Sequence, residues 1–416
     1  MLLVAIYLAT MAWYHLAHTF LVRWQWLIWG EILMLGKELV RFAIIAILVS
    51  REWKTLWQHK QKRLPLITVV ALLCAWSLCV SYQQAIPLRQ QMIGFKYDLL
   101  PLLVLVSAIL IGITTASQDQ HKRQHSFLLC IAWILIFWLL RQWGKLFFSD
   151  FYARRGYGPV GDFVQGMAPP EYYRTWPWGS MRRQWLFAWP NNYGFRLVGI
   201  ASFWMVSLWL LRQKKLLAWW WGIFFLSLLL TLSRGAWIGV FLQMAFLAYV
   251  QWPLQMRRRV LRWFAILILW LLAVSFFKQW SSLAHLQAFT WALGSIAQNP
   301  RWYGLGMSWP AVHFGGAYLP ENHYFQLILD IGLPGVTLWF VSIYLLLRPG
   351  LQALKQAMQA RVCINSLVAL LTLGMLGLLV EGLFLHVFED SMVTYLFLVP
   401  LGIALGREMM KKNHAV

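Results

Sequence analysis

Uninterrupted apolar blocks of about 18 to 25 residues recur along the chain, and this feature constrains the fold more than any other. A helix of that length crosses the roughly 30 Å hydrocarbon core of a bilayer. Only 12% of the residues are charged, against about 25% in soluble domains, so few segments are polar enough to form a water-soluble domain. The sequence therefore predicts an all-α, polytopic membrane protein that forms a single integral domain over residues 1–416.

Hydropathy predicts about twelve transmembrane helices, which places both termini on the same side of the membrane. The predicted spans cover roughly residues 1–20, 28–49, 65–83, 97–116, 126–146, 192–212, 216–232, 235–251, 260–277, 323–347, 362–384 and 389–406. The first block continues into further spans, which indicates an uncleaved first span. The four cysteines lie inside apolar blocks, so we interpret them as small core residues and not as disulfides or metal ligands.

The net charge of +22 comes from basic residues that gather in short loops on one side of the predicted membrane. In a soluble protein this charge would suggest nucleic-acid binding. Here its position follows the positive-inside rule, so the loops such as Arg51–Arg63 and Arg348–Arg361, together with both termini, are predicted to be cytoplasmic.

The opposite side carries two long segments, about residues 147–191 and 278–322, which are rich in Trp, Tyr, Gly, Pro and Arg. Long loops are usually functional or disordered, and the aromatic content argues against disorder. We therefore expect functional residues in these segments. An alternative is that they form interfacial helices that lie on the bilayer, since Trp and Tyr suit its surface.

The stretch Thr231-Leu-Ser-Arg-Gly-Ala-Trp237 is predicted to form a tight turn between two spans on that same side. A hairpin this short needs Gly235, and Arg234 then lies at its tip. A charge at this depth requires water, lipid phosphate or a ligand. The alternative to ligand binding is an arginine that extends to lipid phosphates.

Several further arginines occur in the long segments or beside them, where the positive-inside rule does not favour them. They are Arg154, Arg155, Arg174, Arg182, Arg183, Arg196 and Arg301. A guanidinium grips phosphate oxygens in pairs, so we expect two or three of these residues to bind an anion, with a pyrophosphate-linked lipid as the natural ligand. The others are interpreted as solvated surface residues.

Residues 299–335 contain many Gly and Pro residues, which indicate an irregular loop ahead of the tenth span. Glu321, Asn322 and His323 are predicted to lie at the N-terminus of that span, where free N–H groups favour anions. A histidine there can act as general base toward a sugar hydroxyl, or it can simply cap the helix. With only 14 acidic residues and no Asp-x-Asp pair, a metal site is not expected, and no Walker A motif supports ATP hydrolysis.

Three local patterns resemble the bacterial membrane family of lipopolysaccharide O-antigen ligases and related polymerases. Trp189-Pro-Asn-Asn-Tyr-Gly194 resembles its Pro-Asn segment, and Thr231–Ala236 resembles its Ser-Arg-Gly turn. Asn299–Gly306, together with Glu321-Asn-His-Tyr-Phe-Gln326 and Gly332-x-x-Gly335, resembles its large periplasmic loop and the following helix. The family usually has His where this chain has Glu321.

The resemblance implies a GT-C-like architecture in the bacterial inner membrane and a periplasmic active site. It implies an inverting, metal-independent glycosyltransferase without cofactor, which transfers a glycan from undecaprenyl pyrophosphate to a sugar hydroxyl of lipid A–core. The candidate catalytic residues are His313, His323 and Glu321. The candidate pyrophosphate ligands are Arg234, Arg154, Arg155, Arg196, Arg182 and Arg301, with Asn322, Tyr324 and Asn191 as acceptor or structural support.

Two sets of alternatives remain open at this stage. An O-antigen or exopolysaccharide polymerase, or a protein O-oligosaccharyltransferase, would share the donor site. A transporter or flippase of polyprenyl-linked sugars belongs to another class, and the polar residues of the second span, Glu31, Lys37, Glu38 and Arg41, could serve it as a pathway. Many transporters contain internal repeats, and the absence of a clear repeat in this sequence argues against a transporter.

Overall fold

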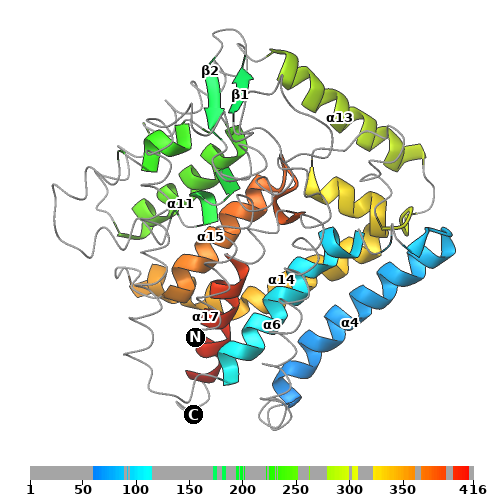
Figure 1. Ribbon diagram of the computed structural model, residues 1–416. Coiled ribbons are helices and arrows are strands. Elements are labelled where there is room, and N and C mark those ends of the chain that lie inside the picture. Colours follow the sequence, from blue (N-terminus) through cyan, green and yellow to red (C-terminus); the bar gives the residue numbers. More distant parts are fainter. Residues whose placement is uncertain are drawn as a thin grey trace, which may run out of the picture. The chain divides into compact units, whose positions relative to one another are not determined.

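The computed structural model of the 416-residue chain divides into two compact units, which are described separately. The structure describes residues 60–88, 91, 94–114, 172–175, 180–183, 194–195, 197–199, 201, 222, 224–229, 231, 233–251, 262, 279–298, 302–307, 322–360, 367–389 and 397–411 (Figure 1). The predicted spans 1–20, 28–49 and 126–146 lie outside these residues, as does 260–277 apart from residue 262. The prediction of one integral domain stays a prediction.

The larger unit is helical, which confirms the predicted helical class for this part of the chain. Its elements are α4 (Lys60–Gln83), the π-helical turn η1 (Phe95–Leu99), α6 (Leu100–Thr114), α11 (Arg234–Gln251), α13 (Gln279–Gln298), α14 (His323–Ala360), α15 (Leu367–Glu381), the 3₁₀ turn η3 (Val387–Glu389) and α17 (Leu398–Lys411). Their apolar runs coincide with predicted spans, except in α13. The predicted segment 278–322 therefore includes a regular helix of 20 residues.

The smaller unit departs from the all-α prediction through one hairpin. Strand β1 (Tyr172–Thr175) pairs antiparallel with β2 (Ser180–Arg183), and Tyr173 lies opposite Arg182 in the register. Tyr and Thr favour strands, and the four residues between the strands are a common hairpin length. Strands of four residues are too short for a period-two pattern to emerge in this Arg-rich and Pro-rich segment.

The prediction that Arg348–Arg361 forms a cytoplasmic loop is wrong in its secondary structure, because α14 continues to Ala360. The stretch Leu351-Gln-Ala-Leu-Lys-Gln-Ala-Met-Gln-Ala360 consists almost entirely of strong helix formers. Their summed propensity carries the helix past Pro349, which the hydropathy boundary placed outside it.

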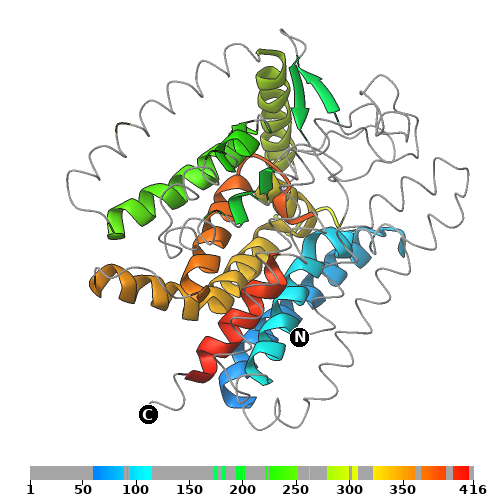
Figure 2. The same ribbon diagram turned by 60° about the vertical axis from the view of Figure 1, so that its left-hand side comes forward.

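Helix α14 is the central element of the larger unit and packs against α4, α13, α15 and α17. Helix α15 in turn packs against α11 and α17 (Figures 1 and 2). The N-terminus of α14 and the C-terminus of α15 therefore come together, and α11 begins beside the same end of α15.

Small residues let several of these helices approach backbone to backbone. Gly402 and Gly406 of α17 face Ala108 and Gly112 of α6, and a Cβ on either α17 glycine would meet α6 backbone atoms. The two helices lie side by side in Figures 1 and 2. Each contributes a small-x-x-x-small pair, which is the packing pattern typical of membrane helices.

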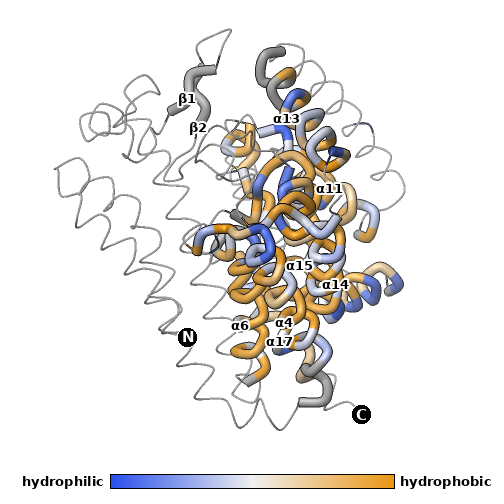
Figure 3. Tube along the Cα trace, turned by 90° about the vertical axis from the view of Figure 1, so that its right-hand side faces the viewer, coloured by the Kyte–Doolittle hydropathy of each residue, from blue (hydrophilic) through white to orange (hydrophobic). Residues whose placement is uncertain are grey.

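Polar side chains are buried inside the larger unit, whereas many apolar side chains are exposed. Figure 3 shows that hydrophobic positions predominate along most of its helices. The buried polar residues include Ser77, Ser81, Gln243, Asn322, His323, Gln326, Asp330, Ser342, Thr372 and Glu381. The exposed apolar residues include Ile67, Leu72 and Leu78 of α4 and Leu333, Phe340, Val341 and Tyr344 of α14. Exposed apolar residues that gather on one surface are typical of protein–protein or membrane interaction sites.

Candidate functional site

Asn322 caps the N-terminus of α14 and ties it to the end of α15. Its side-chain Oδ1 accepts hydrogen bonds from the backbone N–H groups of Tyr324 at 2.9 Å and Phe325 at 3.1 Å. Its Nδ2 donates to the carbonyl of Leu383 at 2.8 Å. Asparagine is among the best N-cap residues because a short side chain reaches these free donors. The helix start predicted from the Glu-Asn-His sequence is thus held by a buried side chain.

His323 follows the cap and is fully buried, with 0% of its surface exposed. Its backbone N–H donates to the carbonyl of Gly382 at 3.0 Å. Its ring lies 5.1 Å from that of Phe388 and 5.6 Å from that of Trp339, measured between centroids. These edge contacts fix the imidazole inside an aromatic cage.

Tyr324 anchors the same turn from the other side. Its ring stacks on Phe340 with centroids 5.2 Å apart, and its hydroxyl donates to the carbonyl of Leu379 in α15. Together with the Asn322–Leu383 and His323–Gly382 bonds, this contact makes three hydrogen bonds that join the start of α14 to the end of α15.

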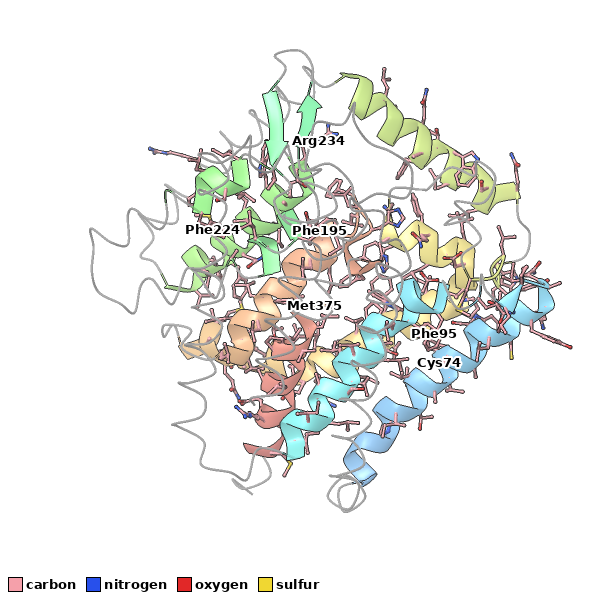
Figure 4. All side chains as sticks on the ribbon, in the orientation of Figure 1. Cys74, Phe95, Phe195, Phe224, Arg234 and Met375 are labelled. Atoms are coloured by element: carbon pink, nitrogen blue, oxygen red, sulfur yellow. The ribbon has the colours of Figure 1, made fainter. Side chains whose placement is uncertain are left out.

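Arg234 begins α11 and its side chain is partly exposed (Figure 4), whereas Gly235, Ala236 and Trp237 behind it are buried. The expectation that Gly235 serves the geometry of a tight turn is wrong, because Gly235 lies within the first turn of α11 and is not among the positive-φ glycines. The need for glycine is steric. A Cβ at this position would lie 3.2 Å from Cγ and 3.6 Å from Oε1 of Glu381.

Glu381 is the last residue of α15, and its carboxyl group lies against the start of α11. The side chain is 0% exposed, and neither oxygen has a hydrogen-bond partner among the described residues. The next residue, Gly382, accepts the hydrogen bond from His323 N–H. The pair Glu381–Gly382 therefore contacts both the start of α11 at Arg234–Gly235 and the start of α14 at Asn322–His323. These two helix starts are 88 positions apart in the sequence.

Gln326 extends this polar cluster one helical turn along α14. It is 0% exposed, and its amide group makes no hydrogen bond to any described residue. Residues three apart lie on the same side of a helix, so Gln326 follows His323 toward the interior. A buried carboxyl and a buried amide without partners are uncommon in folded proteins, which makes Glu381 and Gln326 candidates for functional residues.

A break in α14 lies below this cluster, at Gly332. This residue has φ 70° and ψ 177°, which L side chains rarely adopt, and a Cβ there would meet the backbone of Trp302 and Tyr303. The N–H of Leu333 donates to the Trp302 carbonyl at 2.8 Å, and Pro334 has no N–H. The Leu333 N–H is therefore used outside the helix and Pro334 offers no N–H, so α-helical hydrogen bonds are missing here and the helix is interrupted at Gly332.

The carbonyl groups freed by the break accept hydrogen bonds from other segments. Leu329 accepts from Leu305 N–H at 2.7 Å, Asp330 from Gly306 N–H at 3.0 Å, and Ile331 from Trp76 Nε1 at 2.7 Å. The 302–307 turn also bonds to α4, because Met307 N–H donates to Ser81 Oγ at 3.0 Å. The Gly332-x-x-Gly335 motif thus fastens the loop before α14 to the middle of the helix.

The structure brings the predicted residues Asn322, His323 and Tyr324 to the end of α15. The predicted residue Arg234 precedes Gly235, which lies beside Glu381 at that same end of α15. Arg182 is described only as a backbone position in β2. The remaining predicted residues, His313, Glu321, Arg154, Arg155, Arg196, Arg301 and Asn191, lie outside the described residues.

Sequence reasoning missed Glu381 and Gln326. A signal for Glu381 was present, because the chain has only 14 acidic residues and this one falls inside the predicted span 362–384. An ionisable residue at such a position is a candidate functional residue by default. Gln326 gave no signal beyond its place in the Asn-His-Tyr-Phe-Gln sequence.

Comparison with protein-family models, with curated proteins and with solved structures finds no match to this chain. Within the described ranges, no group of three His, Cys, Asp or Glu side chains could hold a metal ion.

Proposed function

We propose that this chain is a multi-pass inner-membrane protein that acts as an O-antigen ligase on the periplasmic side. It would transfer a glycan from undecaprenyl pyrophosphate to a hydroxyl of lipid A–core and so complete lipopolysaccharide. The observation that carries the proposal is the meeting of Arg234–Gly235, Asn322–His323 and Glu381–Gly382 at the ends of three helices. Two of these pairs belong to the motifs that resemble the ligase family.

The membrane part of the proposal is supported by the distribution of side chains. Among the described residues, one helix, His323–Gln359, is long and apolar enough to cross a bilayer, and four shorter apolar helices accompany it. Exposed apolar faces on α4 and α14 surround buried Ser, Gln, Asp and Glu residues. This arrangement suits helices whose outer faces meet lipid, because ionisable groups in a membrane face the bundle interior.

The chemical step would be a direct displacement at the anomeric carbon. The acceptor oxygen forms a bond to the anomeric carbon while the bond between that carbon and the pyrophosphate oxygen breaks. The configuration at the anomeric carbon is therefore inverted in the product. The proton of the acceptor hydroxyl passes to a base, and the lipid pyrophosphate leaves with the bonding electrons. Arg234 and further periplasmic arginines would stabilise the developing phosphate charge.

The base is one of His313, His323 and Glu321 in this proposal. The aromatic cage and full burial of His323 suit a residue that holds the start of α14 in place. Glu381 would complete the site as a buried carboxyl beside the first turn of α11. No metal, nucleotide or other cofactor enters this scheme.

The test uses purified protein in detergent with undecaprenyl-pyrophosphate glycan and lipid A–core, with EDTA present and no nucleotide. The proposal predicts glycan attached to lipid A–core, and loss of that product in one of His313→Ala, His323→Ala and Glu321→Ala. Longer lipid-linked glycan in place of this product would identify a polymerase, and transfer to a protein would identify an O-oligosaccharyltransferase.

A lipid-linked sugar transporter is the second candidate, and the broken helix α14 favours it, because discontinuous helices form the binding sites of many transporters. In this chain, however, the carbonyl groups freed at Gly332 accept hydrogen bonds from Trp76, Leu305 and Gly306. These hydrogen bonds stabilise the packing of α14 against α4 and against the 302–307 turn. A folded preparation that forms no glycan product but moves lipid-linked sugar across vesicles would favour the transporter.

A further inference from the structure

Helix α13 presents three different faces, and one of them forms a recess of about 520 Å³. The residues that line it are Gln287, Thr290, Trp291, Gly294, Ser295 and Gln298. Their spacing of three, four, seven, eight and eleven positions places them on one side of the helix over three turns. The recess is therefore a continuous groove along α13.

The other two faces of α13 have other contacts. Ala288 and Ala292 are buried, and α13 packs against α14, where the Phe289 ring lies 5.1 Å from that of Phe325. Leu286 and Leu293, seven positions apart, form an exposed apolar stripe beside the recess. Figure 3 shows the resulting mixture of hydrophilic and hydrophobic positions along α13. If the stripe lies in the lipid surface, the recess stays open above it.

The chemistry of the recess suits a neutral sugar. Glutamine amides and Ser and Thr hydroxyls both donate and accept hydrogen bonds, as sugar hydroxyls require, and the partly exposed indole of Trp291 offers an apolar surface for the face of a pyranose ring. The helix from Gln279 to Gln298 contains no Asp, Glu, Lys or Arg, although the chain carries a net charge of +22. A groove without charge has no means to prefer a phosphate.

Gly294 supplies a second, independent observation. Glycine lowers helix stability in an interior position, and glycines elsewhere in this unit are required by close packing. Nothing lies within 4 Å of a Cβ placed on Gly294. The glycine is thus not needed for packing among the described residues, and its effect is to keep the middle of the groove open beside Trp291.

We propose that this face of α13 binds neutral sugar units of a glycan chain. The inference rests on the proposed function in one respect: the glycan would be that of the lipid-linked donor or its product, held at the membrane surface while the reacting end lies elsewhere. Binding energy from this remote part of the substrate would support the reaction at its end.

The experiment measures saturation-transfer NMR on the purified full chain in detergent with maltohexaose, chitohexaose and mannohexaose. We expect transfer to at least one of them, reduced about tenfold in Trp291→Ala and in Gly294→Leu. Leucine is a better helix former than glycine and a Cβ at this position has no neighbour within 4 Å, so Gly294→Leu should block the groove while α13 stays folded. Leu286→Ala, on the apolar stripe, is the matched control and should keep the wild-type signal.

Equal signals in the wild type and both groove variants would overturn the proposal, as would the absence of transfer to all three sugars. Glycosyl transfer is measured on the same preparations. If the protein binds sugar in a Trp291-dependent way but forms no glycan product, the groove proposal stands and the ligase proposal is rejected. If both groove variants form the glycan product with an unchanged KM for the donor, the ligase proposal stands and the groove proposal is rejected.

Discussion

Replacing Asn322 by alanine removes the cap of α14 and its bond to the end of α15 in a single change. The lost cap leaves the N–H groups of Tyr324 and Phe325 without their acceptor, which costs about 1 kcal/mol. The Leu383 carbonyl also loses its donor at 2.8 Å, and the loss of this partly buried hydrogen bond costs about 0.5 to 1.5 kcal/mol. We therefore expect Asn322→Ala to lower the free energy of unfolding by about 1.5 to 2.5 kcal/mol.

Asn322→Asp separates the two contributions, because aspartate is an equally good cap but has no amide group to donate to Leu383. Unfolding in detergent is followed by intrinsic fluorescence during titration with denaturant. The stability order should be wild type, then Asn322→Asp, then Asn322→Ala. Identical stabilities of the two variants would show that the cap contributes nothing, and a wild-type value for Asn322→Ala would refute the reasoning for both bonds.

Three further predictions concern the packing around the site. The Cβ of Gly235→Ala would lie 3.2 Å from Glu381 Cγ, so this substitution should be less favourable in the wild-type background than in a Glu381→Ala background by about 1 kcal/mol; additive effects in the double mutant would exclude the contact. Gly332→Ala combines a positive φ with a backbone clash and should abolish the monodisperse fraction in size-exclusion chromatography, whereas Gly294→Ala should retain it. Trp76→Phe removes the indole donor to the carbonyl before Gly332 and should lower stability by about 1 to 3 kcal/mol, and an unchanged unfolding curve would show that this bond contributes nothing.

The apolar helices of the larger unit could be predicted from the sequence, because their apolar runs are long and carry few charges. Helix α13 was anticipated only by the alternative of an interfacial helix, because polar residues interrupt its apolar positions. The start of α14 at His323 agrees with the prediction, since Asn322 is a strong cap and the apolar run begins directly after it. The end of α14 was missed, because helix propensity beyond Pro349 is independent of hydropathy. The β1–β2 hairpin was missed for lack of a period-two pattern.

The site was predictable in its motifs but not in its assembly. Arg234 and the Asn322–Tyr324 turn were selected by residue type and spacing, yet no local rule indicates that Glu381 and Gly382 lie between them. That proximity depends on the packing of α15 against α11 and α14, which is a long-range property. For the same reason, the steric role of Gly235 became evident only from the position of the Glu381 side chain.

The central claim is that Arg234 serves glycan transfer at a site where three helix ends meet, and its most direct test is the rate of that transfer. The measurement compares wild type, Arg234→Lys and Arg234→Ala with undecaprenyl-pyrophosphate glycan and lipid A–core in EDTA. The account predicts a wild-type product on lipid A–core, a rate at least about a hundredfold lower in Arg234→Ala, and partial recovery in Arg234→Lys, with all three proteins equally folded. Full activity in Arg234→Ala would contradict it.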